Sequence, residues 1–230
     1  MSTCSVVVAV GSGLAENRFF FNRLFRNTPS PFELIVVDNG TCDGTAAYLN
    51  ELPDRKLIRF PVDMGLARAW NCALRIATGK QIVFVRTSAV LPPGWLETLR
   101  AEAAAARRPA VVQPINRSTL VKHPNLFRRV LGQLTEVGES RFASEEELAT
   151  VYRGGYDQFA RTLARRFGHV KVGSSTAGCL LVAREICQAG YLFPEGFLST
   201  VSDVIGQFIA TVAAVGRYKV IVTPKLYVHS

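Results

Sequence analysis

The first hundred residues alternate between short apolar runs, which are typical of buried strands, and longer stretches with apolar residues at helical spacing. In Gly65–Ala77, for example, Leu66, Trp70 and Ala73 fall on one face of a helix. Strands that alternate with helices of this length predict a doubly wound, mostly parallel α/β sheet. The predicted strands are Ser5–Val10, Phe32–Val37, Leu57–Phe60 and Gln81–Val85, and the predicted helices are Leu14–Arg26, Gly44–Leu52, Gly65–Ala77 and Trp95–Ala106.

The pattern changes in the second half of the chain. Between Asn116 and Val170 the sequence is basic and helical, so we expect an inserted helical subdomain at 116–170 within a single domain spanning residues 1–230. The sheet pattern then resumes. The predicted elements are a strand at Gly178–Ala183, a helix at Ser202–Val215 and a last strand at Tyr218–Val222.

The net charge of the chain limits the classes of partner that it is expected to bind. The formal net charge is +9, and Ala101–Lys171 contributes +5 of it, with twelve basic residues against seven acidic ones. A basic surface attracts nucleic acid, anionic lipid or phosphorylated small molecules. The chain has no zinc-ligand spacing, RNP-type aromatic motif or helix-turn-helix pattern, which disfavours nucleic acid. Its uncharged stretches, such as the apolar Val204–Gly216, are shorter than the ~20 residues that span a bilayer. We therefore expect any membrane contact to be peripheral.

The five cysteines include no CxxC pair. An odd number of cysteines in a domain of this size predicts reduced, mostly buried thiols and a cytoplasmic protein.

The end of the fourth predicted strand is a candidate ligand site. In QIVFVRTSAVLPPGWL, the apolar run stops at Arg86, Thr87 and Ser88. In open α/β sheets, ligands bind outside the carboxyl ends of the strands. These three side chains are therefore expected to meet a ligand.

Other polar residues stand at the ends of predicted elements. Asp38 ends the second strand, where it could accept a hydrogen bond from a ribose or base, or brace the following turn. Arg68 and Asn71 lie near the start of a helix, where phosphate is favoured, although a solvated arginine is the alternative. Asp203 begins an apolar helix as either an N-cap or a general base. His229 follows the last strand and is a metal ligand only if a second ligand joins it.

Five stretches, taken in order, resemble the nucleotide-sugar glycosyltransferases of family 2, which have the GT-A fold. They are ELIVVDNGTCDGTAAYL, DMGLARAWNCALRIATGKQIVFV, VLPPGWLETL, AGCLLVARE and KVIVTPKLYVHS. The resemblance covers about the first hundred and the last fifty residues. It implies a Rossmann-like GT-A domain that binds a nucleoside-diphosphate sugar, with Mn²⁺ or Mg²⁺ on the diphosphate.

The resemblance also implies roles for individual residues. Asp38 would bind the base, and Arg68 would lie near the base or diphosphate. Asp203 would be the catalytic base. The remaining implied positions are Arg86, Thr87 and Ser88 at the DXD-type metal motif, His229 completing the metal site, and Gly178 and Cys179 beside the sugar and acceptor.

The chain departs from the family pattern at these motifs. Arg86-Thr87-Ser88 replaces the expected acidic triplet, and Ser202 replaces the glutamate that usually precedes Asp203. Divalent Mg²⁺ and Mn²⁺ prefer carboxylate oxygens. The sequence therefore predicts a degenerate DXD motif and a weak or absent metal site.

Two hypotheses are open at this point. The chain is an inverting glycosyltransferase in which Arg86, together with Arg68, neutralises the leaving diphosphate without a metal. Alternatively, it is a catalytically inactive relative that binds a nucleotide sugar, a glycan or a protein. A lipid-linked, glycan or protein acceptor would suit the basic middle region.

Overall fold

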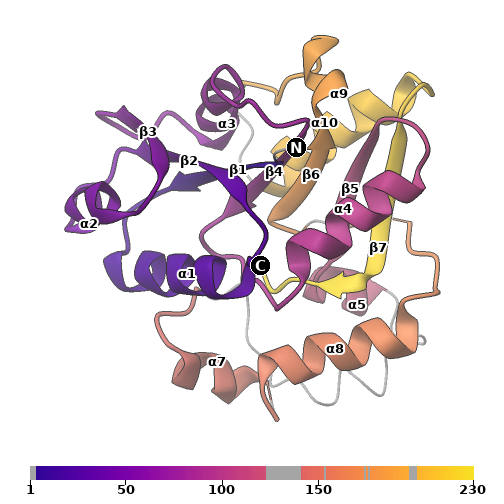
Figure 1. Ribbon diagram of the computed structural model, residues 1–230, viewed down its shortest axis with the longest axis horizontal. Helices are drawn as coiled ribbons and strands as arrows, with labels where there is room; N and C mark the ends of the chain where they lie inside the picture. The colour runs from indigo at the N-terminus through magenta and orange to yellow at the C-terminus, as the bar shows by residue number, and fades with distance from the viewer. Residues whose placement is uncertain (1–3, 123–140, 153, 174, 176, 197–200) are drawn as a thin grey trace.

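The computed structural model describes residues 4–122, 141–152, 154–173, 175, 177–196 and 201–230. Strands and helices alternate along the first half of the chain, as the hydrophobic pattern predicts (Figure 1). The strands are β1 (Cys4–Val10), β2 (Phe32–Asn39), β3 (Arg55–Phe60), β4 (Gln81–Arg86), β5 (Ala110–Ile115), β6 (Cys179–Ala183) and β7 (Lys219–Tyr227). The helices are α1 (Leu14–Asn27), α2 (Thr45–Glu51), α3 (Leu66–Leu74), α4 (Trp95–Ala105), α5 (Arg117–Lys122), α7 (Glu145–Val151), α8 (Tyr156–Phe167), α9 (Arg184–Gln188) and α10 (Val201–Ala214).

The strands form one sheet in the order β3-β2-β1-β4-β6-β5-β7. All neighbouring pairs are parallel except those made by β6, which is antiparallel to both β4 and β5. This arrangement confirms the predicted doubly wound, mostly parallel sheet. Because β4 lies on the opposite side of β1 from β2, the crevice between β1 and β4 is a topological switch point, where such sheets bind ligands.

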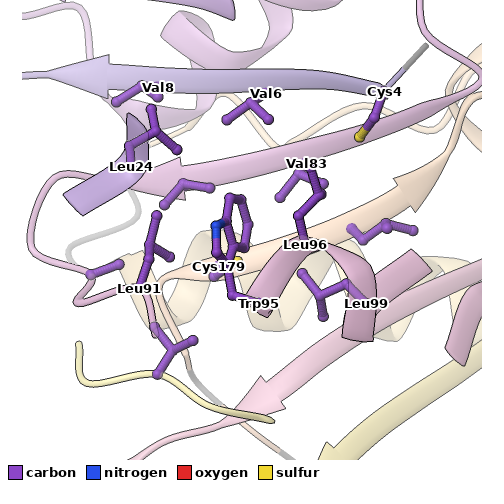
Figure 2. Close-up of a cluster of buried hydrophobic side chains, with 14 of the residues drawn as sticks. Cys4, Val6, Val8, Leu24, Val83, Leu91, Trp95, Leu96, Leu99 and Cys179 are labelled. Atoms are coloured by element: carbon purple, nitrogen blue, oxygen red, sulfur yellow. The ribbon is translucent and has the colours of Figure 1, made fainter. Parts of the chain in front are cut away.

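Two apolar layers cover the faces of the sheet. One contains Phe20 of α1 and Trp95 of α4 against alternate residues of β1 and β4, and Figure 2 shows Trp95 close to Leu91 and Cys179 in this layer. The other contains Trp70 of α3 and Phe208 of α10. Side chains alternate along a strand, so consecutive residues belong to different layers. This alternation decides which side of the sheet each residue at a strand end faces.

The structure differs from the sequence predictions at several elements. The strand β5 was not predicted, because its apolar core Val111-Val112 is short and Pro114 lies near its end. A register shift against β7 follows Pro114, as expected for a residue that cannot donate to the ladder. The last strand extends to Tyr227, well beyond the predicted end, and Arg86 is inside β4.

An aromatic cluster joins the segment after β5 to the sheet. Tyr152, Tyr156 and Phe159 of this segment pack with Val90, which follows β4, and with Tyr227 of β7. Residues 123–140, which are part of the predicted insertion at 116–170, lie outside the described residues. The described part of that segment is helical, and it shares its apolar cluster with β5 and β7.

The cysteines are all free thiols. Cys4 and Cys179 are buried, Cys72 and Cys187 are half-buried, and Cys42 is exposed. Burial raises the pKa of the Cys4 thiol to about 12. Within the described parts of the chain, no helix is both long and apolar enough to cross a membrane.

Candidate functional site

The carboxyl ends of three adjacent strands bring most of the predicted donor-site residues together. In the register of the sheet, Val10 of β1 is paired with Asp38 of β2, and Ala9 is paired with Arg86 of β4. Asp38 and Arg86 therefore flank the end of β1, at the switch point. This juxtaposition follows from the strand order, which places β1 between β2 and β4.

Asp38 is almost completely buried, with 1% of its surface exposed. Its Oδ1 accepts a hydrogen bond from the backbone N–H of Thr41 at 3.0 Å, and its Oδ2 accepts from Nε of Arg59 at 2.9 Å. These contacts match the turn-bracing alternative for Asp38. A nucleotide base that binds Asp38 would have to share the carboxylate with these two donors.

Asp43 connects the beginnings of two helices. Its carboxylate accepts from the backbone N–H groups of Gly13 and Leu14, at the start of α1, and from that of Thr45, at the start of α2. Hydrogen bonds from Thr45 and from the Gly13 N–H lower the pKa of Asp43 to about 2. Asp43 therefore stabilises the first turns of both α1 and α2.

The triplet at the end of β4 has three different environments. The backbone N–H of Arg86 donates to the carbonyl of Gly178 at 2.9 Å, and the Arg86 side chain lies over that glycine. Thr87 accepts a hydrogen bond through its Oγ1 from Arg141. The Oγ of Ser88 is buried and has no hydrogen-bond partner among the described residues.

Arg141 was not predicted to be a site residue, yet it lies across the switch point. Its Nη1 donates to the backbone carbonyl of Ser12, after β1, at 2.9 Å. Its Nη2 donates to Asn17 Oδ1 at 3.1 Å and to Thr87 Oγ1, after β4, at 3.3 Å. Arg141 is 54 residues away from Thr87 in sequence and stands in a stretch rich in basic residues, so no local pattern distinguishes it.

The residues present do not fit the divalent metal that the resemblance implies. The triplet Arg86-Thr87-Ser88 offers no carboxylate, and a guanidinium group contacts Thr87. Among the described residues there is no group of three His, Cys, Asp or Glu side chains that could hold a metal ion. A hard dication needs several oxygen ligands and is repelled by nearby cations. Arg86, Thr87 and Ser88 are therefore not a set of ligands for Mg²⁺ or Mn²⁺.

His229 belongs to the aromatic cluster. It is 2% exposed, its Nδ1 lies 2.6 Å from the hydroxyl of Tyr152, and its ring packs edge-on against Phe142. Its backbone carbonyl accepts from the N–H of Val90 at 2.9 Å. These contacts attach the end of the chain to the loop after β4. They give His229 a packing role, in contrast to the metal role that the resemblance implies.

A second group of predicted residues lines a pocket on the α3 and α10 side. Arg68, in the first turn of α3, is exposed and lines a pocket of about 500 Å³ together with Glu195, Gly196 and Val204. Asp203, which directly precedes Val204, is exposed in the first turn of α10. The fold therefore brings Arg68 and the start of the Asp203 helix to one pocket, although 135 residues separate them in sequence.

Asn71 has a positioning role within the protein. It is 7% exposed, and its side-chain amide donates to the carbonyl of Phe193 and to Oε1 of Glu195, both at 2.8 Å. Its Oδ1 accepts from the N–H of Phe193 at 3.0 Å. Asn71 thus holds the segment that leads toward α10. Both polar atoms of the Asn71 side chain are engaged in these bonds, and its contact with a donor stays a prediction.

Gly178 and Cys179 differ sharply. The N–H of Gly178 donates to Ser230 Oγ at 2.9 Å, and a Cβ on this glycine would lie 3.2 Å from both Arg86 Cδ and Ser230 Cβ. Gly178 therefore permits close packing at the strand ends. Cys179 has no exposed surface, and Figure 2 shows it within the core layer. Its thiol is packed in that layer, and a contact of Cys179 with the sugar or acceptor stays a prediction.

Comparisons with known proteins agree with the fold. The model of a family described as "Glycosyl transferase family 2" matches residues 6–170. No curated protein matches the chain.

Solved structures match over nearly the full chain. One is the mannosyltransferase PcManGT from Pyrobaculum calidifontis, in complex with GDP-Man and Mn²⁺, with a TM-score of 0.65 and 19% identity over 99% of this chain and 56% of that chain. Another is TarS from S. aureus in complex with UDP-GlcNAc, with a TM-score of 0.60 and 15% identity over 99% of this chain and 58% of that chain. The chain thus spans just over half the length of these two similar proteins.

Proposed function

The chain belongs to glycosyl transferase family 2, and on this premise we propose that it transfers a sugar from a nucleoside-diphosphate sugar to an acceptor hydroxyl, with inversion at the anomeric carbon. One observation carries the proposal. Arg68 lines a pocket of about 500 Å³ together with Val204, which follows Asp203 in the first turn of α10. This reaction requires two groups. A cation stabilises the anionic leaving group, and a carboxylate takes the proton of the acceptor hydroxyl.

In the proposed reaction, Asp203 takes the proton of the acceptor hydroxyl as its oxygen attacks the anomeric carbon. The bond between that carbon and the diphosphate oxygen breaks, and the diphosphate leaves with the electron pair. A single in-line displacement of this kind inverts the configuration. The exposure of Asp203 supports this role, because the acceptor must reach the carboxylate.

The donor would bind at the strand ends. We propose that Asp38 shares its carboxylate with the base, and that Thr87 and Ser88 lie beside the diphosphate with Arg86 and Arg68. Arginine binds phosphate oxygens through two parallel N–H donors and is well suited to stabilising the charge of a leaving diphosphate. The nucleotide sugars in the complexes of the similar proteins, GDP-Man and UDP-GlcNAc, support a donor of this class. The exposed side of the pocket leaves room for a glycan, lipid-linked or protein acceptor.

A second candidate function is binding without turnover. It is favoured by the contacts of Asp38, which already pairs with Arg59 and the turn, and by the absence of a metal-ligand group among the described residues. In this case the scaffold would bind a nucleotide sugar, a glycan or a protein partner and leave the glycosidic bond intact.

The deciding experiment is sugar transfer in EDTA with Asp203→Asn. We expect transfer or donor hydrolysis by the unchanged protein in EDTA, because arginine replaces the metal, and a loss of about 10²–10⁴-fold in Asp203→Asn, because the general base is removed. A panel of UDP- and GDP-linked sugars with radiolabelled product detection measures both. The matched control is Glu185→Gln, which neutralises an exposed acid in the first turn of α9.

Three results would overturn parts of the proposal. Full activity in Asp203→Asn removes Asp203 from the base role. Activity that EDTA abolishes contradicts the metal-free reaction. Calorimetric binding of a nucleotide sugar without turnover across the panel supports the binding function.

A further inference from the structure

Arg141 places a cation across the carboxyl ends of β1 and β4. All three acceptors of Arg141 are neutral, namely a backbone carbonyl, a side-chain amide and a hydroxyl. No carboxylate of the described residues lies within 4.0 Å of its guanidinium. Arg23, Arg26, Arg59, Lys56 and Lys225 each pair with a carboxylate.

The position of Arg141 is held by the fold. Its guanidinium contacts the loops after β1 and β4 together, so it spans the two strand ends that define the switch point. Gly13 provides the space for it, since a Cβ there would lie 3.0 Å from Arg141 Nη1, and Gly13 has a positive φ of 122°. Asn17, which is fully buried, orients the guanidinium from α1.

Arg141 also keeps donors for a ligand. A guanidinium has five N–H donors, and three serve the acceptors described above. No acceptor among the described residues takes the other two, and the side chain is exposed. Two acidic groups lie on this side: Glu16, whose Oε2 approaches the same face of Gly13 as the guanidinium, and Asp43, which is bound to the N-terminus of α1. Because Asp43 already accepts hydrogen bonds from the N–H groups at the start of α1, an anion at the ends of β1 and β4 would bind the guanidinium and not this helix N-terminus.

We propose that Arg141 binds the diphosphate of the donor and makes the site selective for nucleoside diphosphates over monophosphates in the absence of a metal. This inference rests on the proposed function and deepens it. The two remaining N–H donors, on Nε and Nη1, can each donate to a phosphate oxygen, and charge-assisted bonds to phosphate are about twice as strong as neutral ones. The second phosphate of a nucleoside diphosphate adds negative charge close to Arg141. A diphosphate therefore gains more from this cation than a monophosphate does.

The test is calorimetric titration in EDTA with UDP and GDP, with UMP and GMP, and with inorganic pyrophosphate. We expect the unchanged protein to prefer the diphosphates and to bind pyrophosphate. In Arg141→Gln, diphosphate and pyrophosphate affinity should fall about 10- to 100-fold, and monophosphate affinity much less, so the preference is lost. Arg141→Lys, which keeps the charge but not the planar guanidinium, should retain part of it.

The matched control is Arg161→Gln, which removes the same charge from an exposed position of α8 and should leave every affinity unchanged. Thermal unfolding and circular dichroism of each variant show whether it is folded, and Arg141→Lys provides a second variant if Arg141→Gln is not. An unchanged diphosphate preference in folded Arg141→Gln overturns this inference and leaves the proposed function intact. If the unchanged protein binds none of the nucleotides, the proposed function and this inference fail together.

Discussion

Arg23 and Arg141 both connect the segment after β5 to the first half of the chain, and they do so in contrasting ways. Arg23 is 2% exposed and pairs with Glu145 at 2.7 Å and with Asp157. It also donates to the carbonyl of Leu91 and lies against the ring of Tyr156. Arg141 is exposed and contacts neutral groups.

The difference separates a structural cation from one suited to a ligand. A buried guanidinium must be matched by carboxylates, because an unpaired buried charge is very costly. An exposed guanidinium is hydrated and can be held by neutral acceptors, so its charge remains available to an anion. Substitution of Arg23 should therefore lower the stability of the protein, whereas substitution of Arg141 should lower its affinity for a ligand.

The largest expected effect is the loss of stability in Arg23→Met. Arg23→Met removes the hydrogen bonds of a buried guanidinium to two carboxylates and to the Leu91 carbonyl, which costs about 2–3 kcal/mol, because the carboxylates left behind are partly exposed and become hydrated. Urea unfolding at pH 7 should show this decrease in the free energy of unfolding. Arg26→Met is the matched control, since Arg26 pairs with the same Glu145 but its side chain is 54% exposed, and exposed pairs contribute about 0–1 kcal/mol. Equal losses in the two variants would contradict a structural role specific to Arg23.

An intermediate effect on stability is expected for Glu33→Gln. The Glu33 carboxylate joins β2 to neighbouring segments through hydrogen bonds. Burial raises the pKa of Glu33, but hydrogen bonds from Lys56, Ser5 and Thr78 outweigh it and lower the pKa to about 2, from an ordinary 4.5. A lowered pKa stabilises the folded state fully above 4.5, and this contribution is lost as the pH falls toward 2. Glu33→Gln should therefore lower stability at pH 7 by about 1–2 kcal/mol and flatten its decline between pH 5 and pH 2.

Urea unfolding at pH 7, 5 and 3 measures this dependence. Glu51→Gln, which changes an exposed carboxylate at the end of α2, serves as the control and should keep the normal acid dependence. A Glu33→Gln protein that loses stability in acid as steeply as the unchanged protein would contradict the assignment. The contacts of Arg141 involve no carboxylate, so they should not contribute to this acid dependence.

The smallest stability effect is expected for Arg141→Gln. Three hydrogen bonds from an exposed side chain to neutral acceptors contribute about 0.5–1 kcal/mol in total, because water replaces most of them. The same urea titration measures the change beside Arg23→Met. A loss as large as that of Arg23→Met would make Arg141 a structural anchor and remove the contrast between the two residues.

Much of the scaffold could be predicted from the sequence. The βαβ pattern, the strand ends at Asp38 and Arg86, and the helix that carries Asp203 follow from hydrophobic periodicity. The strand β5 could not be distinguished with the same certainty, because a short apolar run with a proline fits several structures. Individual side-chain roles were harder. The burial of Cys179 and the aromatic contacts of His229 depend on which layer each residue faces, and on partners that are distant in sequence.

The sequence by itself determined the doubly wound sheet, the family resemblance and the lack of acidic residues at the end of β4, because each depends on local periodicity or on residue identity. Only the tertiary structure decided that Arg68 shares a pocket with the Asp203 helix, that Asn71 holds the segment before α10, and that Arg141 spans the ends of β1 and β4. The physical reason is that a site at a sheet edge is assembled from loops far apart in the chain. Contacts between such loops leave no periodic signal in the sequence.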